Sequence, residues 1–245
     1  MRTATRNGQR IVNSIVAQHL DFVLFSFDIS KAFAKGMTFE ELARCTGEPL
    51  RVVEFDLSPD DVKILRRIPG YETFDPATET LRMLKAIYGL KDAPRAWRKK
   101  LHQALYSFGL RQLHAEAELY SKHLAIDRPD GQRAAIADMV QKEINNASEN
   151  QVNVVAVQPT IRTLLCLLSA HVDDLKGGAP RKIAEELLSY LNKAVGECKA
   201  NWIEFVHTGI QHSQTKLGIH CHQFAYIDQL QLVDVSSLKG KDDWC

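Results

Sequence analysis

The chain has 245 residues, of which 45% are hydrophobic, and it carries 31 Lys and Arg residues against 30 Asp and Glu residues. This length suits one large domain or two small ones, and the hydrophobic content excludes disorder over the whole chain. Because the charges balance, the overall charge gives no sign of a nucleic-acid partner, and any basic surface must be local.

The cysteines and the N-terminal segment indicate the compartment. Five cysteines are scattered along the chain without a C-x-x-C pair, so we expect free thiols in a reducing, intracellular environment. The N-terminal segment is basic but lacks an uninterrupted apolar run, and no run in the chain approaches the roughly 20 residues that span a bilayer. We therefore expect neither a secretory signal nor a membrane segment.

Apolar spacing in the first part of the chain predicts a helix followed by a strand. Residues 9–19 carry apolar side chains at helical intervals, and DFVLFSF, residues 21–27, is an aromatic and β-branched run typical of a strand that ends at Asp28. Gly and Pro residues then divide residues 30–61 into loops and short elements whose order the pattern does not fix.

A basic amphipathic helix is predicted after Pro94. Its apolar face is formed by Trp97, Leu101, Ala104, Leu105 and Phe108, and Gly109 is its predicted C-cap. Its other face carries Arg95, Arg98, Lys99 and Lys100. Over residues 82–122, nine basic residues exceed three acidic ones, an excess that suits a surface following a phosphate backbone. A solvated helix face explains the same pattern equally well.

The second half of the chain begins with a polar segment. Residues 125–160 are irregular, which predicts an insertion with at most one helix, around residues 134–145. The apolar run TLLCLLSA, residues 163–170, predicts a buried strand, and Pro180 is placed to begin a helix. The tail, residues 201–230, predicts two short strands and a final helix that begins near Ala225.

Two adjacent carboxylates, Asp173 and Asp174, follow the apolar run. Like charges a few ångströms apart resist joint ionisation, so a site that keeps them together usually contains a cation. Asp28, at the end of the other predicted strand, supplies a third carboxylate if the two strands are antiparallel neighbours. Alternation along a strand sends Asp173 and Asp174 to opposite faces, so we expect Asp173 to be the principal metal ligand.

Magnesium is the metal that this set of oxygen donors favours. It prefers carboxylate and phosphate oxygens, and two ions about 4 Å apart can clamp the attacking and leaving oxygens in phosphoryl transfer. Taken alone, Asp173 and Asp174 fit a hairpin turn better than a metal site, and Asp28 fits a strand end or a helix N-cap. The metal interpretation depends on the three carboxylates acting together.

Three segments, in this order, resemble the reverse transcriptase domain of copia-type LTR retrotransposons. They are FDISKAF at residues 27–33, LKAIYGLKDAPRAWRKKL at residues 84–101, and LLSAHVDDLKGG at residues 167–178. The middle motif is the most specific, because it is long and has no general role elsewhere. The resemblance extends from about residue 10 to about residue 232, apart from the insertion.

The resemblance implies a fold, an activity and its partners. The fold would be α+β, a right-hand polymerase palm whose antiparallel sheet is flanked by helices, with incomplete fingers and little or no thumb. The activity would be RNA-directed DNA polymerase, adding deoxynucleoside triphosphates to a primer on an RNA or DNA template. Asp28, Asp173 and Asp174 would be the catalytic, metal-binding residues for two magnesium ions, which manganese could replace. The remainder of a retrotransposon polyprotein would be a further partner.

The resemblance also implies contacts with substrates. The nucleotide-binding positions would be Phe33, Tyr88, Gly89 and Lys91, and the nucleic-acid-binding positions would be Arg95, Arg98, Lys99 and His171. A ring at Phe33 would collide with a 2′-hydroxyl and so favour deoxynucleotides, although a core phenylalanine is the alternative. Gly89 would allow close backbone approach, and Arg95 can instead brace the start of its helix.

The implied domain plan has five parts. These are a partial fingers helix at residues 1–20, a first palm part with the basic helix at 21–124, the insertion at 125–160, a second palm part with the catalytic hairpin and primer-grip-like strands at 161–235, and a tail at 236–245. Two residues depart from the family pattern, because His171 replaces a usual Tyr and Asp92 a common Gln. With the insertion and the reduced fingers and thumb, they suggest a polyprotein fragment or a decayed copy.

Two other functions are compatible with the sequence. One is a catalytically silent palm fragment that at most binds nucleic acid. The other is a small zinc module, although the spacing of its candidate ligands fits no standard zinc pattern. Those candidates are Cys198, His207, His212, His220, Cys221 and His222.

Overall fold

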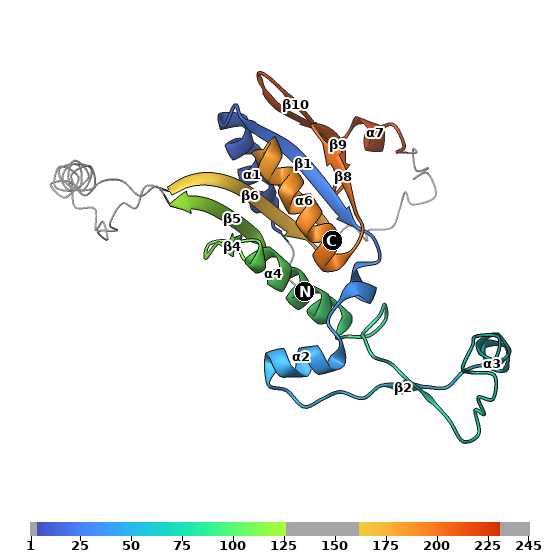
Figure 1. Cartoon of the computed structure of the whole chain (residues 1–245). Helices are drawn as coiled ribbons and strands as arrows, with labels where there is room; N and C mark the ends of the chain where they lie inside the picture. Colours follow the sequence, from blue (N-terminus) through green and yellow to red (C-terminus); the bar gives the residue numbers. More distant parts are fainter. Residues whose placement is uncertain (1–3, 126–161, 231–245) are drawn as a thin grey trace, which may run out of the picture.

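The structure is a computed structural model that describes residues 4–125 and 162–230. This part of the chain has a mixed α+β fold built on a six-stranded antiparallel sheet (Figure 1), which confirms the predicted α+β class. The helix predicted around residues 134–145 and the tail at 236–245 lie outside the described residues.

The six-stranded sheet joins segments from both halves of the chain. Its strand order is β4-β5-β6-β7-β1-β8, and every neighbouring pair is antiparallel. The strands are β1 (Phe22–Ile29), β4 (Arg111–Gln112), β5 (Leu119–Ala125), β6 (Arg162–His171), β7 (Asp174–Pro180) and β8 (Cys198–Trp202). The strands predicted at residues 21–27 and 163–170 are therefore confirmed as β1 and β6, and β1 continues one residue past Asp28.

Two helices, α4 (Ala93–Ser107) and α6 (Arg181–Val195), cover one face of the sheet (Figure 1). Phe25, Phe27 and Ile29 of β1 point toward this face, because alternate residues of a strand share a face, and they pack in one core with Trp97 and Leu187. Both helices confirm the amphipathic segments predicted after Pro94 and Pro180. Pro94 lies in the first turn of α4 and Pro180 is the N-cap of α6, and at neither position does the missing N–H cost the helix a backbone hydrogen bond.

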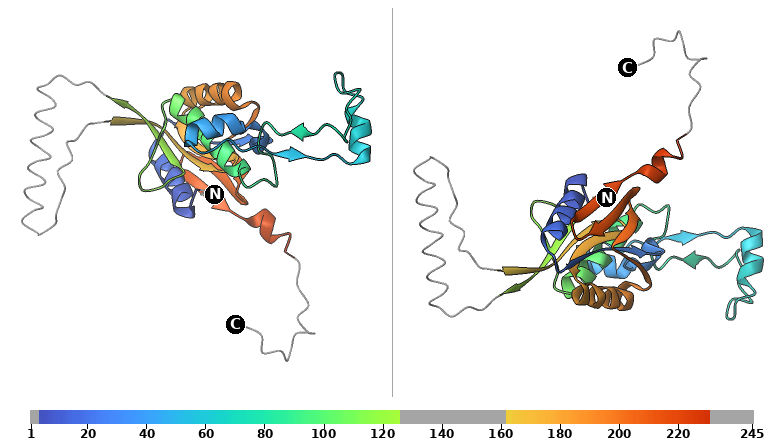
Figure 2. Two further views of the ribbon diagram at one scale, coloured as in Figure 1. Left: turned by 90° about the horizontal axis from the view of Figure 1, so that it is seen from below. Right: turned by 90° about the horizontal axis from the view of Figure 1, so that it is seen from above.

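The opposite face of the sheet is covered by α1 (Arg6–Gln18) and by a second, three-stranded sheet (Figure 2). Phe22 and Leu24 of β1 pack there against Val12 and Val16 of α1. The small sheet has the order β11-β10-β9, with β9 (Glu204–His207), β10 (Ile210–Thr215) and β11 (Gly218–His222). The helix predicted at residues 9–19 is confirmed as α1, which packs directly on the main sheet.

The tail contains more strands than the sequence predicts. Four strands, β8 to β11, occupy the region, and the final helix, α7 (Phe224–Ile227), begins beside the predicted Ala225. The expectation of two strands was wrong because β10 (IQHSQT) and β11 (GIHCH) are largely polar. A small sheet that buries little of its surface needs few apolar residues, so the alternating pattern that marks a strand is weak there.

The region between β1 and α4 forms short elements and a projecting arm (Figures 1 and 2). Its elements are the 3₁₀ helix η1 (Ala32–Lys35), α2 (Phe39–Thr46), β2 (Glu54–Phe55), α3 (Pro59–Leu65) and β3 (Leu81–Arg82). A capping box between Thr38 and Glu41 begins α2, and the Ser58 hydroxyl caps α3. Among the helices in the described ranges, none combines the length and apolar character needed to cross a membrane.

Two adjacent glycines in β7 let the layers approach closely. A Cβ on Gly177 would lie 2.6 Å from Cζ of Phe25 and 2.7 Å from the carbonyl oxygen of Leu167. A Cβ on Gly178 would lie 2.0 Å from Cγ2 of Val16. Glycine at these positions therefore allows both the aromatic core and α1 to pack on β7.

Candidate functional site

The predicted aspartates meet at one end of the β1–β7 pair. Asp28 is the direct cross-strand partner of Asp174, and opposed residues of this kind have Cβ atoms about 5 Å apart. Strand alternation puts both on the face that carries Phe22 and Leu24, away from α4 and α6. The fold therefore brings together two carboxylates from motifs that lie far apart in the sequence.

Asp173 lies in a turn rather than in a strand. His171 pairs with Asp174, so the β6–β7 hairpin closes through the two residues between them. The Ile29 N–H donates a hydrogen bond of 3.1 Å to the Asp173 carbonyl, which ties this turn to the end of β1. The alternation argument that favoured Asp173 over Asp174 does not apply to a turn residue, and the register makes Asp174 the direct neighbour of Asp28.

The three carboxylates influence one another electrostatically. Burial raises the pKa of the half-buried Asp174 above its usual range, the charges of Asp173 and Asp28 raise it further, and nearby His171 opposes the rise. Within the described residues, no Lys or Arg side chain forms an ion pair with any of the three aspartates. Negative charge gathered without a paired basic side chain favours a bound cation.

The donor set limits which metal could bind. In the described ranges, no group of three or more His, Cys, Asp or Glu side chains could hold a metal ion by itself. Structural zinc needs four protein ligands, so this finding gives the alternative zinc module no support. Magnesium commonly takes one or two carboxylates and completes its shell with water and substrate phosphates. The paired Asp28 and Asp174 fit that partial role.

Two of the predicted nucleotide-binding residues contact each other. The rings of Phe33, in η1, and Tyr88 have centroids 4.8 Å apart and an interplanar angle of 54°. Phe33 is half-buried against the core, whereas Tyr88 is 63% exposed, so this pair presents an aromatic edge to solvent. Gly89 has a positive φ of 92°, a turn conformation that favours glycine, and Lys91 is exposed.

The basic face of α4 is partly neutralised. Arg95 donates two hydrogen bonds of 2.7 Å to the carboxylate of Glu48, and Arg98 forms a 2.5 Å ion pair with the buried Glu118. Lys99 is exposed and has no ion-pair partner in the part of the chain that the structure describes. Arg95 and Arg98 are therefore less available to a nucleic acid than their places on the basic face suggest.

The two departures from the family pattern differ in their surroundings. His171 is half-buried on the aspartate face, and its Nδ1 atom is buried without a hydrogen-bond partner among the described residues. Asp92 forms an ion pair with Arg51 of the loop before β2. The extra negative charge at Asp92 is thus balanced locally, whereas His171 lies at the candidate site itself.

A buried polar cluster, which the sequence did not predict, lies beside the aspartates. Lys176 is 1% exposed, and its Nζ atom lies 3.2 Å from Nε2 of His212. Burial lowers the pKa of Lys176 to about 8. Burial and the nearby Lys176 charge together lower the pKa of His212 to about 4 and that of His207 to about 3. Strand alternation could have placed Lys176 near the aspartates, because it follows Asp174 by two residues and so lies on the same face of the strand.

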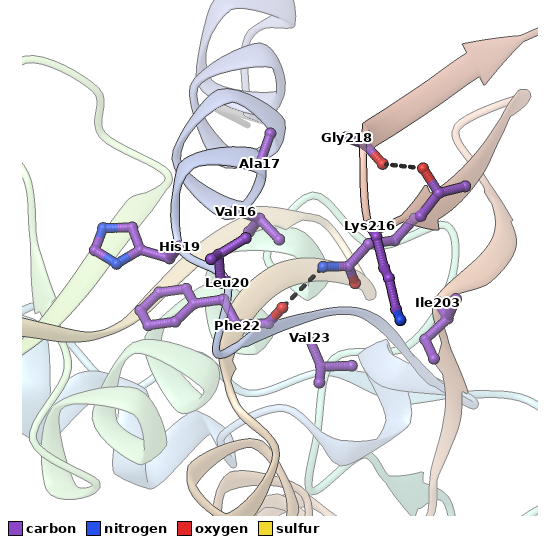
Figure 3. A pocket seen from close by; sticks show the side chains of 11 residues that line it. Val16, Ala17, His19, Leu20, Phe22, Val23, Ile203, Lys216 and Gly218 are labelled. Atoms are coloured by element: carbon purple, nitrogen blue, oxygen red, sulfur yellow. Dashed lines mark hydrogen bonds between the residues drawn. The ribbon is translucent and has the colours of Figure 1, made fainter.

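One pocket lies away from the aspartates. It has a volume of about 600 Å³ and lies between the end of α1 and the β10–β11 hairpin, where the Phe22 carbonyl accepts a 2.8 Å hydrogen bond from Gln214 (Figure 3). Val23, which also lines it, is five residues from Asp28, and a strand rises about 3.3 Å per residue. The pocket is therefore separate from the candidate metal site.

Comparisons with protein-family models, curated proteins and solved structures found no match to this chain.

The four cysteines in the described ranges, Cys45, Cys166, Cys198 and Cys221, are free thiols, as the sequence predicts.

Proposed function

We propose that this chain is the RNA-directed DNA polymerase domain of a copia-type retrotransposon, a reverse transcriptase. The observation that carries the proposal is the cross-strand pairing of Asp28 with Asp174, with Asp173 in the adjoining turn. Each aspartate alone suits a turn or a strand end, but those roles do not require residues of two distant motifs to be neighbours. An antiparallel sheet with α4 and α6 on one face, and with Asp28 and Asp174 on the face that α1 and the small sheet also occupy, supports a palm.

In this proposal Asp28, Asp173 and Asp174 would hold two magnesium ions, which manganese could replace, and water and substrate phosphates would complete the coordination. Bound at this site, the metal would supply Lewis-acid activation of the primer 3′-hydroxyl and charge neutralisation of the incoming triphosphate. The aspartates themselves fix a concentrated negative charge at the end of β1, where the Ile29 N–H restrains the Asp173 backbone. Because burial and like charges raise the pKa of Asp174, metal binding is expected to strengthen as pH rises and this carboxyl loses its proton.

Other residues of the chain would contact the substrates. The Phe33 ring would lie beneath the sugar and exclude a 2′-hydroxyl, and its contact with Tyr88 would keep the ring in place. Lys91 and Lys99 are exposed and would pair with phosphates, while His171 would lie near the primer terminus. The partners would be a primer, an RNA or DNA template, deoxynucleoside triphosphates and the rest of a retrotransposon polyprotein.

Primer extension tests the proposal. The protein is incubated with a DNA primer on an RNA template, deoxynucleoside triphosphates and Mg²⁺, and extension is compared between the parent and Asp173→Asn. Asp60→Asn is the matched control, because Asp60 is an exposed aspartate in α3. We expect extension by the parent and the control and none by Asp173→Asn. Equal extension by Asp173→Asn would overturn the proposal.

A second candidate is a silent palm fragment that binds nucleic acid without extending it. Two observations favour it: Arg95 and Arg98 are engaged by carboxylates, and the described residues lack a group of three metal ligands. The same samples distinguish the two candidates. Retention of primer–template by the parent without any extension in Mg²⁺ or Mn²⁺ would establish the silent fragment.

A further inference from the structure

The turn that carries Asp173 has an unfavourable backbone. Val172 has a φ of +59°, whereas Asp173 does not have a positive φ, a pattern found in type II′ hairpin turns. That first turn position favours glycine, and a β-branched residue there is an outlier. Strain of this kind persists only where surrounding contacts hold the backbone in place.

Trp97 of α4 supplies such a contact. Its indole N–H donates a 2.7 Å hydrogen bond to the carbonyl oxygen of Val172, and its side chain is fully buried. The Ile29 N–H binds the next carbonyl, that of Asp173. Hydrogen bonds from α4 and from β1 therefore fix the carbonyl groups of Val172 and Asp173, the two residues of the turn.

The same part of α4 also holds the segment that follows Asp28. The Met37 N–H donates to the Ala96 carbonyl at 3.3 Å, and a Cβ on Gly36 would lie 3.1 Å from the backbone nitrogen of Trp97. The first turns of α4 thus contact both the turn that carries Asp173 and the segment that follows Asp28 and η1, and Trp97 lies at both contacts.

We propose that Trp97 is a positioning residue, whose indole N–H holds the Val172 carbonyl and thereby fixes the strained turn that presents Asp173 and Asp174 beside Asp28. Its link to DNA synthesis rests on the proposed function, but its role in ordering the turn does not. A packing role alone would need only the ring, whereas this role needs the N–H group.

The test removes the N–H group and keeps an aromatic ring. Amide hydrogen exchange at Ile29 and in the turn is measured for the parent, Trp97→Phe and Trp97→Phe/Val172→Gly, together with the Mg²⁺ dependence of primer extension. Trp202→Phe is the matched control, since Trp202 packs on the same core from β8. Gly at position 172 adopts positive φ without strain and should remove the need for the hydrogen bond.

We expect Trp97→Phe to speed exchange at Ile29 about fivefold, the effect of losing one net hydrogen bond, and to raise the Mg²⁺ concentration needed for extension. The double variant should reverse both changes, and Trp202→Phe should show neither. Unchanged exchange in Trp97→Phe would overturn the proposal. If Trp97→Phe fails to fold, folding of the double variant supports the proposal, and failure of both variants contradicts it. Absence of extension in the parent would refute the proposed function alone, because exchange still decides the role of Trp97.

Discussion

Replacing His207 with Leu should make the stability of the protein less sensitive to acid. His207 is 1% exposed in β9, and burial, reinforced by the charges of Lys176, His212 and His171, lowers its pKa to about 3 from an ordinary value of 6.5. Between pH 6.5 and about 3, His207 binds a proton in the unfolded chain but stays neutral in the folded chain. The free energy of unfolding therefore falls as pH drops below 6.5.

The size of the effect follows from the pKa difference. At pH 5 the unfolded His207 is about 1.5 pH units below its pKa while the folded one stays neutral, and each unit is worth about 1.4 kcal/mol, so the loss is about 2 kcal/mol. Both ring nitrogens of His207 lack partners among the described residues, so Leu should not destabilise the protein at pH 7.5.

Urea unfolding followed by circular dichroism at pH 7.5 and pH 5 measures this effect. We expect the parent to lose about 2 kcal/mol more than His207→Leu on acidification. His220→Leu, at an exposed position in β11, should lose as much as the parent. An equal loss in the parent and His207→Leu would show that His207 is not buried as described.

Two further substitutions test the packing of the same face. Lys176→Met should raise the free energy of unfolding at pH 7 by about 2 kcal/mol. A pKa lowered from 10.5 to about 8 means that the charged, buried amine destabilises the folded protein by about 3 kcal/mol, and its hydrogen bond to His212 offsets about 1 kcal/mol of this. This gain should shrink as pH rises from 8 to 10.5, and a pH-independent difference would contradict it. Gly178→Ala should destabilise the protein by about 1 to 3 kcal/mol through its clash with Val16, and Val16→Ala should cost less in that background than in the parent. Additive effects in the chemical denaturation of these variants would show that the two residues do not touch.

The helices and the apolar strands could be predicted from sequence because their patterns are long and local. The spacing of Trp97, Leu101 and Leu105 reappears as the buried face of α4, and the run at residues 163–170 is the interior of β6. β7 could not be predicted in this way. Its sequence, DLKGGAP, contains two glycines and a buried lysine and so lacks the apolar pattern of a buried strand. It is a strand through its pairing with β1 and β6, and its glycines leave room for Phe25 and Val16.

The candidate site, like the fold, could be predicted from the sequence only in part. The motifs predict that Asp28, Asp173 and Asp174 share one site, but their register depends on strand pairing, which the sequence does not specify. Arg95 is neutralised by Glu48, which lies before α4 and outside residues 82–122, and Arg98 by Glu118, which lies beyond the end of α4. No local pattern marks such partners, so the sequence could not show that carboxylates engage Arg95 and Arg98.

Incorporation of a single nucleotide tests the central claim most directly. The parent, Asp28→Asn and Asp174→Asn are given a primer on an RNA template, Mg²⁺ and either the matching deoxynucleotide or its ribonucleotide, with primer–template binding measured alongside. We predict that the parent adds the deoxynucleotide in preference to the ribonucleotide, and that both variants bind the primer–template without adding either. Incorporation by Asp28→Asn or Asp174→Asn at the rate of the parent would contradict a metal site shared by these two paired aspartates.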